Sequence, residues 1–243
     1  MLLYMPHPAL PLKSCTLRSL FYQNVTESFD LDCPMKYNYL YEKFPWPDWI
    51  SGSVNGLICF AAGENDLFIG NPSIRKYRKL PYPRSILMKS VRWPRYSFGY
   101  DEFHDDYKVV GVFTNCYISD QDETHICLKD DSWRSVDDCP SEILLNGSGI
   151  FLTGKLRWDT AAPGLNVYNG GNVYSFDLAD EKWRKTVEQR SYQGGGFVSW
   201  LTVLASDLSI FCDYEGTHID VWVMEKYGVK ESWTIMFCHQ MSW

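Results

Sequence analysis

Short apolar runs separated by polar turns make up most of the chain. Four runs rich in β-branched and aromatic residues lie at 56–60, 107–113, 154–158 and 208–212, recur about every 50 residues, and are bounded by Gly, Asn, Asp and Ser. This composition and these boundaries are typical of β-strands. No stretch of about 12 residues has helical periodicity, so the pattern predicts an all-β protein.

A second pattern repeats in step with the first. In each copy an apolar strand is followed by a polar turn, and a tryptophan follows the turn. Successive tryptophans are 50 residues apart. Three copies are clear and a fourth, which has a tyrosine instead, is weaker. The copies are 127–134 with Trp133, 176–184 with Trp183, 226–234 with Trp233, and 69–78 with Tyr77.

A unit of three or four short antiparallel strands cannot bury its own faces, whereas units stacked face to face can. Repeats of about 50 residues are typical of kelch propellers. The sequence therefore predicts a partial or small β-propeller of about four kelch-like blades of short antiparallel strands, with the three tryptophans packed between blades. The expected blades are 51–81, 96–137, 148–188 and 197–238, and residues 1–50 are expected to add strands of an incomplete blade.

Composition and charge narrow the function classes. With 10 Trp, 16 Tyr and 13 Phe in 243 residues, the chain has enough apolar area to fold, and its net charge of −7 opposes binding to nucleic acid. No uncharged run is long and apolar enough to span a membrane. Residues 1–12 lack a basic n-region and contain three prolines, so we expect an intracellular protein of the cytoplasm or nucleus.

The eight cysteines show no CxxC spacing, which excludes zinc-ribbon and thioredoxin-like motifs. Cys59 and Cys212 lie in apolar strand candidates, where a free thiol packs as a small apolar group. We therefore expect reduced, buried thiols.

Five motifs, in order along the chain, resemble those of the plant F-box-associated, kelch-repeat-like domain. The resemblance covers roughly residues 50–238. It implies a β-propeller that recognises the substrate protein in a ubiquitin ligase of the SCF type, as a protein-interaction domain without catalysis. In this family a separate F-box of helices binds a Skp-type adaptor. The motifs are Gly52 to Cys59, Asn71 to Pro81, Phe98 to Val110, Phe176 to Trp183 and Val221 to Trp233.

The start of the chain departs from the family pattern. Leu10-Pro11-Leu12-Lys13 lacks the acidic residue of an F-box and is followed by a strand-like segment. The expected organisation is a linker and strand-like region without an F-box at 1–50, the propeller at 51–238, and a tail at 239–243. We expect a truncated or divergent member that does not bind a Skp-type adaptor directly.

The sequence contains no recognisable active site, metal site or cofactor site. Its five histidines do not form a metal-ligand spacing, Gly147-Ser148-Gly149 lacks the spacing of a nucleophile elbow, and Gly194 to Gly196 is not a phosphate loop. Two alternatives to the interaction domain stay open. One is an enzyme on a kelch propeller, either an oxidase or a glycan-processing protein, and the other is a non-functional fragment of a duplicated F-box gene.

Charge is distributed unevenly within the predicted propeller. Residues 71–100 contain eight basic side chains and no acid, whereas residues 101–138 contain eleven acids. The segment from Pro83 to Tyr96 is expected to be a connector between blades, and Trp and Arg are enriched in binding hot spots. One interpretation is that this connector binds an acidic segment of the partner protein through Arg84, Lys89, Arg92, Trp93 and Arg95. The alternative is that Trp93 packs on a blade edge and its neighbouring arginines are solvated.

Overall fold

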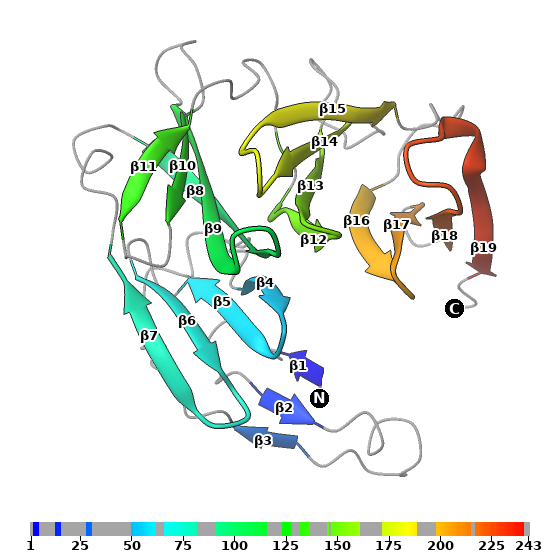
Figure 1. Cartoon of the computed structure of the whole chain (residues 1–243). Coiled ribbons are helices and arrows are strands. Elements are labelled where there is room, and N and C mark those ends of the chain that lie inside the picture. The colour runs from blue at the N-terminus through cyan, green and yellow to red at the C-terminus, as the bar shows by residue number, and fades with distance from the viewer. Residues whose placement is uncertain are drawn as a thin grey trace. The chain divides into compact units, whose positions relative to one another are not determined.

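The computed structural model confirms the all-β prediction (Figure 1). Apart from one turn of 3-10 helix, η2 (Lys230–Ser232), every regular element in the described part of the chain is a β-strand. The chain divides into two compact units, Met1–Tyr82 and Pro83–Trp243. The described residues are 2–4, 13–15, 28–30, 50–61, 66–81, 91–115, 123–127, 132–136, 145, 147–160, 172–188, 198–214 and 217–240.

The first unit contains two antiparallel sheets, each with its strands in sequence order. The smaller sheet has three strands and comes from the N-terminal region that was expected to add strands. The larger has four and coincides with the first predicted blade. Their strands are β1 (Leu2–Tyr4), β2 (Lys13–Cys15) and β3 (Ser28–Asp30), and then β4 (Ile50–Val54), β5 (Leu57–Ala61), β6 (Leu67–Asn71) and β7 (Lys76–Leu80).

The second unit contains three four-stranded antiparallel sheets, again in sequence order, at the positions of the other three predicted blades. The first comprises β8 (Val91–Asp101), β9 (Asp106–Asn115), β10 (Glu123–Cys127) and β11 (Trp133–Val136). The second comprises β12 (Ile150–Leu152), β13 (Lys155–Asp159), β14 (Asn172–Asp177) and β15 (Trp183–Glu188). The third comprises β16 (Val198–Leu204), β17 (Asp207–Asp213), β18 (His218–Met224) and β19 (Trp233–Gln240).

Tight turns join the first two strands of several sheets. In the β4–β5 hairpin both central residues, Asn55 and Gly56, have positive φ angles of 51° and 77°. Two-residue turns of this kind match the right-handed twist of the strands, and Asn and Gly tolerate the left-handed conformation best. The same geometry recurs at Thr153 (φ 47°) and Gly154 (φ 71°) between β12 and β13.

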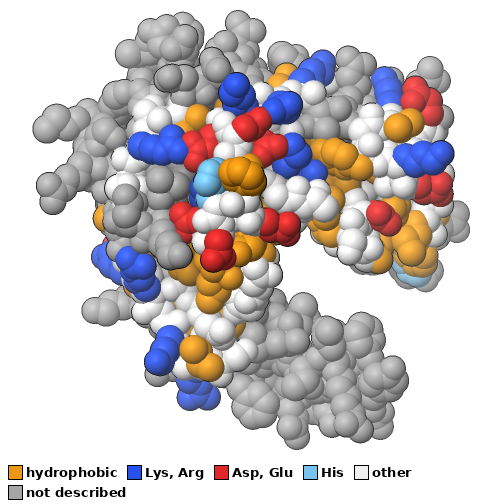
Figure 2. Space-filling view, viewed as in Figure 1, with side chains coloured by type: hydrophobic (Ala, Val, Ile, Leu, Met, Phe, Trp, Pro, Cys, Tyr) orange, Lys and Arg blue, Asp and Glu red, His pale blue; other side chains and the backbone are white. Residues whose placement is uncertain are grey.

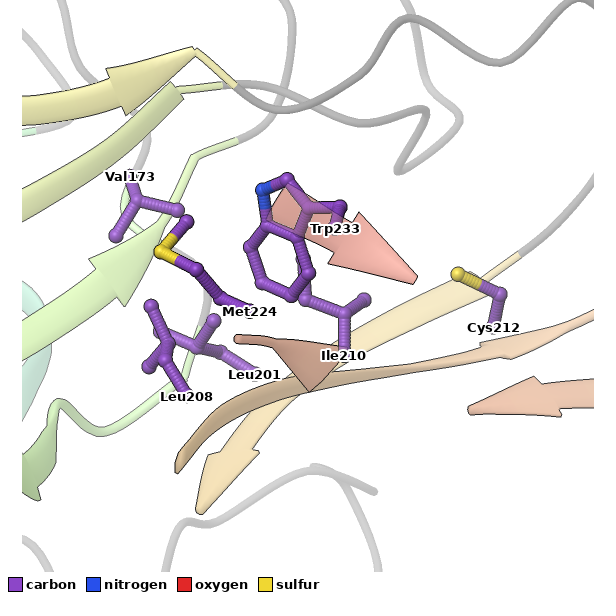
Figure 3. Close-up of a cluster of buried hydrophobic side chains, with 7 residues drawn as sticks. All are labelled: Val173, Leu201, Leu208, Ile210, Cys212, Met224 and Trp233. Atoms are coloured by element: carbon purple, nitrogen blue, oxygen red, sulfur yellow. The ribbon is translucent and has the colours of Figure 1, made fainter. Parts of the chain in front are cut away.

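Buried apolar side chains fill the space between neighbouring sheets of the second unit. Val110 and Val112 of β9 pack with Leu156 and Trp158 of β13 in one cluster. A second cluster joins Val173 of β14 to the β16–β19 sheet, and Figure 3 shows Val173 beside the side chains of that sheet. Stacking of one sheet face on the next is what the repeat predicted. The members of the second cluster are Val173, Leu201, Leu208, Ile210, Cys212, Met224 and Trp233.

The repeated tryptophans follow the prediction in part. Trp233 is only 4% exposed in the cluster between two sheets, and Trp183 is partly buried against the other cluster. Trp133 is half-buried, with its ring 6.2 Å from that of Tyr96 in the same sheet. Burial is therefore deepest in the last sheet.

The thiol prediction holds for two of the three cysteines whose side chains are described. Cys59 and Cys212 are free and buried in β5 and β17. Burial, followed by the nearby charges of Asp220 and Asp159, raises the pKa of the Cys212 thiol to about 12, so it stays protonated at neutral pH. Cys238 is free but exposed on β19, an edge strand, so the expectation of buried thiols is wrong at that position.

The described residues include no helix that is long and apolar enough to cross a membrane.

Candidate interaction surface

A buried lysine connects the turns of two neighbouring sheets in the second unit. Lys108 comes from the start of β9, and its side chain is 3% exposed. Its Nζ lies 2.7 Å from Asp101 Oδ2 in its own sheet. In the next sheet it donates to the Leu178 carbonyl at 2.5 Å and pairs with Glu181 at 2.9 Å. The β8–β9 and β14–β15 turns therefore lie side by side, held by one cation.

Asp101, at the end of β8, fixes the conformation of the β8–β9 turn. Its Oδ1 accepts hydrogen bonds from the backbone N–H groups of Phe103 (3.0 Å) and His104 (3.2 Å). Its Oδ2 contacts His104 Nδ1 at 2.6 Å in addition to Lys108. An aspartate that accepts from the backbone two and three residues later stabilises a turn, and here it does so while buried. Both carboxylate oxygens of Asp101 therefore stabilise the turn, one through backbone N–H groups and the other through the side chains of His104 and Lys108.

Asp177 and Glu181 organise the β14–β15 turn in the same way. Asp177 Oδ1 accepts from the backbone N–H groups of Ala179 (3.0 Å) and Asp180 (3.4 Å), and its Oδ2 pairs with Lys155. Glu181 pairs with Arg134 of β11 as well as with Lys108. Since Arg134 belongs to the preceding sheet, Glu181 receives two cations from that sheet.

We call the linked side chains of Asp101, Lys108, Arg134 and Glu181 the network. Its carboxylates are ionised at neutral pH. Burial raises the pKa of Asp101, but hydrogen bonds from Lys108 and His104 outweigh it and bring the pKa below its ordinary value. Burial also opposes ionisation of Glu181, and Arg134 and Lys108 together lower its pKa. Each buried carboxylate is therefore matched by a cation at neutral pH.

A second buried cation, at the equivalent position of β13, connects the β12–β15 sheet to the β16–β19 sheet. Arg157 of β13 is fully buried, and it donates from Nε to the Tyr227 hydroxyl at 2.8 Å. Its guanidinium carbon lies 4.4 Å from the centre of the Tyr227 ring, within cation–π distance. Tyr227 belongs to the β18–β19 turn. Lys108 and Arg157 thus each connect the second strand of one sheet to the last turn of the next sheet.

The outer side of the β8–β9 and β14–β15 turns is polar, and the large aromatic side chain of Phe103 projects from the first of them. Phe103 is 82% exposed at the β8–β9 turn, between exposed Glu102 and His104. Figure 2 shows hydrophobic side chains beside a histidine, with acidic and basic side chains close by, on the face turned toward the viewer. We call the exposed part of the β8–β9 and β14–β15 turns the turn surface. It consists of the exposed residues Glu102, Phe103, His104, Asp105, Ala179, Asp180 and Lys182.

The predicted connector that was expected to bind a partner is shorter than predicted. Strand β8 begins at Val91, so Arg92, Trp93 and Arg95 belong to a strand and not to a connector. The register shifts between Arg92, opposite Thr114, and Arg95, opposite Val112, which places Pro94 in a β-bulge. A proline fits at a bulge on an edge strand because no ladder hydrogen bond is needed there, and β8 is the edge of its sheet.

Arg95 is half-buried, whereas Arg84 and Lys89 lie outside the described residues, as do the side chains of Arg92 and Trp93. Binding of a partner through these five residues stays a prediction. The basic side chains of the preceding blade motif, such as Lys76 and Lys79 of β7, are exposed.

Neither Lys108 nor Arg157 was among the functional residues predicted from the sequence. The signal was present, because the two cations are the third residues of β9 and β13, and each is followed by a buried apolar side chain. A basic residue at the same position of equivalent buried strands in two successive sheets indicates a buried charge that needs a partner. Among the described residues, no group of three His, Cys, Asp or Glu side chains is arranged to hold a metal ion.

Comparison with known proteins identifies the family. Residues 11–242 match the family described as the F-box associated beta propeller domain. The chain belongs to this family. The match begins well before residue 51, where the sequence predicted the start of the propeller, and that boundary stays a prediction.

Relatives of the chain include F-box proteins of Arabidopsis thaliana. The chain is 30% identical to F-box protein CPR1 over 87% of its own length and 55% of the relative's length. It is 26% identical to an F-box/kelch-repeat protein, over 92% of its own length and 59% of the other's. The chain thus spans little more than half the length of these relatives.

Some solved structures have a similar arrangement at low sequence identity. One is an oligogalacturonate lyase in complex with manganese, with a TM-score of 0.46 and 7% identity over 76% of this chain and 51% of that chain. A likeness of this degree carries no argument about function.

Proposed function

We propose that this chain is the target-recognition domain of an F-box protein, acting by protein–protein interaction and not by catalysis. Its membership of the F-box-associated family is the observation that carries the proposal. The relatives it matches are F-box proteins, and one is an F-box/kelch-repeat protein. Under this proposal the chain works in the cytoplasm or nucleus and binds a protein that is to be ubiquitinated.

We further propose that the turn surface takes part in target binding. Binding residues are often located in loops that a rigid scaffold positions. The contacts of Asp101, Lys108 and Glu181 supply such rigidity, because they tie the β8–β9 and β14–β15 turns to each other and to β11. A surface that is ordered before binding loses less conformational entropy when it binds.

Quantitative affinity capture tests the proposal. The full chain serves as bait in plant extract treated with a proteasome inhibitor, and each captured protein is then produced in pure form. We expect at least one to bind the purified chain saturably, and its half-life in plant cells should change when the chain is overproduced. If every captured protein fails to bind in pure form, the chain does not recognise a target and the proposal is wrong.

A further inference from the structure

We propose that Phe103 anchors a basic segment of the target protein on the turn surface. This inference rests on the proposed function, which it extends by naming the anchoring residue and the chemistry of the bound segment. Phe103 is the most exposed of the large hydrophobic side chains in the described part of the chain. It offers a large apolar area to a partner, and aromatic side chains in such positions frequently dominate binding energy.

The backbone beneath Phe103 is fixed independently of any partner. Its own N–H donates to Asp101 Oδ1, the N–H of His104 donates to the same oxygen, and its ring meets the His104 ring edge to face at 4.8 Å. At the end of the turn, the Tyr100 hydroxyl donates to Asp105. An anchor on such a turn loses little backbone freedom when it is buried in an interface.

The charge around Phe103 selects the kind of partner. Its exposed neighbours Glu102 and Asp105 are acidic, whereas Asp180 on the adjoining turn is paired with Arg184. Lys108 and Arg134 are already paired with Asp101 and Glu181. Lys182 is exposed on the adjoining β14–β15 turn. Phe103 therefore stands next to two exposed acidic side chains, Glu102 and Asp105. A segment with Lys or Arg beside a large apolar side chain complements this arrangement, whereas an acidic segment is repelled.

The β6–β7 turn of the first unit provides a matched comparison. It also exposes a large apolar side chain, Ile74, at 61% exposure. Ile74 is followed by Arg75 and Lys76, both exposed, so its surroundings have the opposite charge. If the chain bound any apolar segment, Ile74 would contribute to binding as well as Phe103. If the chain selects basic segments, only Phe103 contributes.

The experiment uses a random peptide library displayed on phage and selected on the immobilised full chain. We expect the enriched peptides to contain Lys or Arg next to a large apolar residue. The best peptide is then synthesised, and its affinity is measured by fluorescence anisotropy with wild type, Phe103→Ala, Glu102→Gln and the control Ile74→Ala. Thermal melting of each variant shows that it is folded.

The expected result is a loss of about tenfold or more in affinity for Phe103→Ala, with an unchanged melting temperature and wild-type affinity for Ile74→Ala. Glu102→Gln should reduce both the affinity and its dependence on salt. Enrichment of acidic or uncharged peptides, equal binding to wild type and Phe103→Ala, or no enrichment would each overturn the inference. Failure here leaves target capture by the chain intact, so the two proposals fail separately.

Discussion

At the scale of single residues, the polar positions of the family motifs are explained by turn formation. Asn71, Asp101 and Asp177 each end a strand, and each accepts a hydrogen bond from the backbone N–H two residues later. The glycine of the motif at Phe98-Gly99-Tyr100-Asp101 has a different role. A Cβ at Gly99 would come within 2.6 Å of Leu178 and 2.7 Å of Phe151, so only glycine allows the next sheet to approach this closely.

The repeated tryptophans differ in burial, and we expect them to differ in how much each contributes to the free energy of unfolding. Trp233→Ala should lower the free energy of unfolding by about 3–5 kcal/mol, because it leaves a large cavity between two sheets. Trp133→Ala should cost less, since that side chain is only half-buried. Urea denaturation of the two variants measures the difference. A cost below about 1 kcal/mol for Trp233→Ala contradicts its position in the core.

At the scale of strands and turns, Lys108 is the residue whose loss should matter most. We expect Lys108→Met to lower the free energy of unfolding by about 3–5 kcal/mol at neutral pH, because Asp101 would stay buried without its cation. Lys182→Met, on the exposed turn nearby, is the control and should change stability by less than about 0.5 kcal/mol. Equal effects of the two substitutions would show that Lys108 does not connect the sheets.

The same network makes a prediction about pH. The pKa values of Asp101, Asp177 and Glu181 are lowered in the folded protein, so the unfolded chain binds protons more readily. Their stabilisation is therefore present above the unfolded pKa, near 4, and is lost as pH falls through the lower folded values. The stability difference between wild type and Lys108→Met should shrink over that range. Denaturation curves from pH 7 down to about pH 3 test this; a constant difference contradicts it.

At the scale of a whole unit, the three sheets of residues 83–243 should unfold together. Two apolar clusters and two buried cations connect consecutive sheets. Destabilising the last sheet with Trp233→Ala should therefore increase amide hydrogen exchange in β9, two sheets away, as well as in β16–β19. Hydrogen exchange followed by mass spectrometry locates the change. An increase confined to β16–β19 would mean that the sheets unfold independently.

At the scale of the whole molecule, association with the ligase is a separate question from target binding. Residues 1–50 show no F-box pattern, so we expect no binding of this chain to a purified Skp-type adaptor at micromolar concentration. Isothermal titration calorimetry tests this, with an intact F-box protein as the positive control. Micromolar or tighter binding would show that an adaptor-binding surface exists outside the expected motif.

The sequence by itself determined the all-β class, the four sheets of the repeat and the family, because β-branched and aromatic runs, the polar turns that bound them and repeated motifs are local. It also placed Trp233 in the core. It misassigned 91–96 as connector, since a bulge that accommodates Pro94 depends on the register with β9. Only the tertiary structure revealed that Lys108 and Arg157 bridge sheets and that Phe103 stands exposed on a fixed turn. These features depend on which side chains of separate repeats come together, and that is decided when the sheets pack.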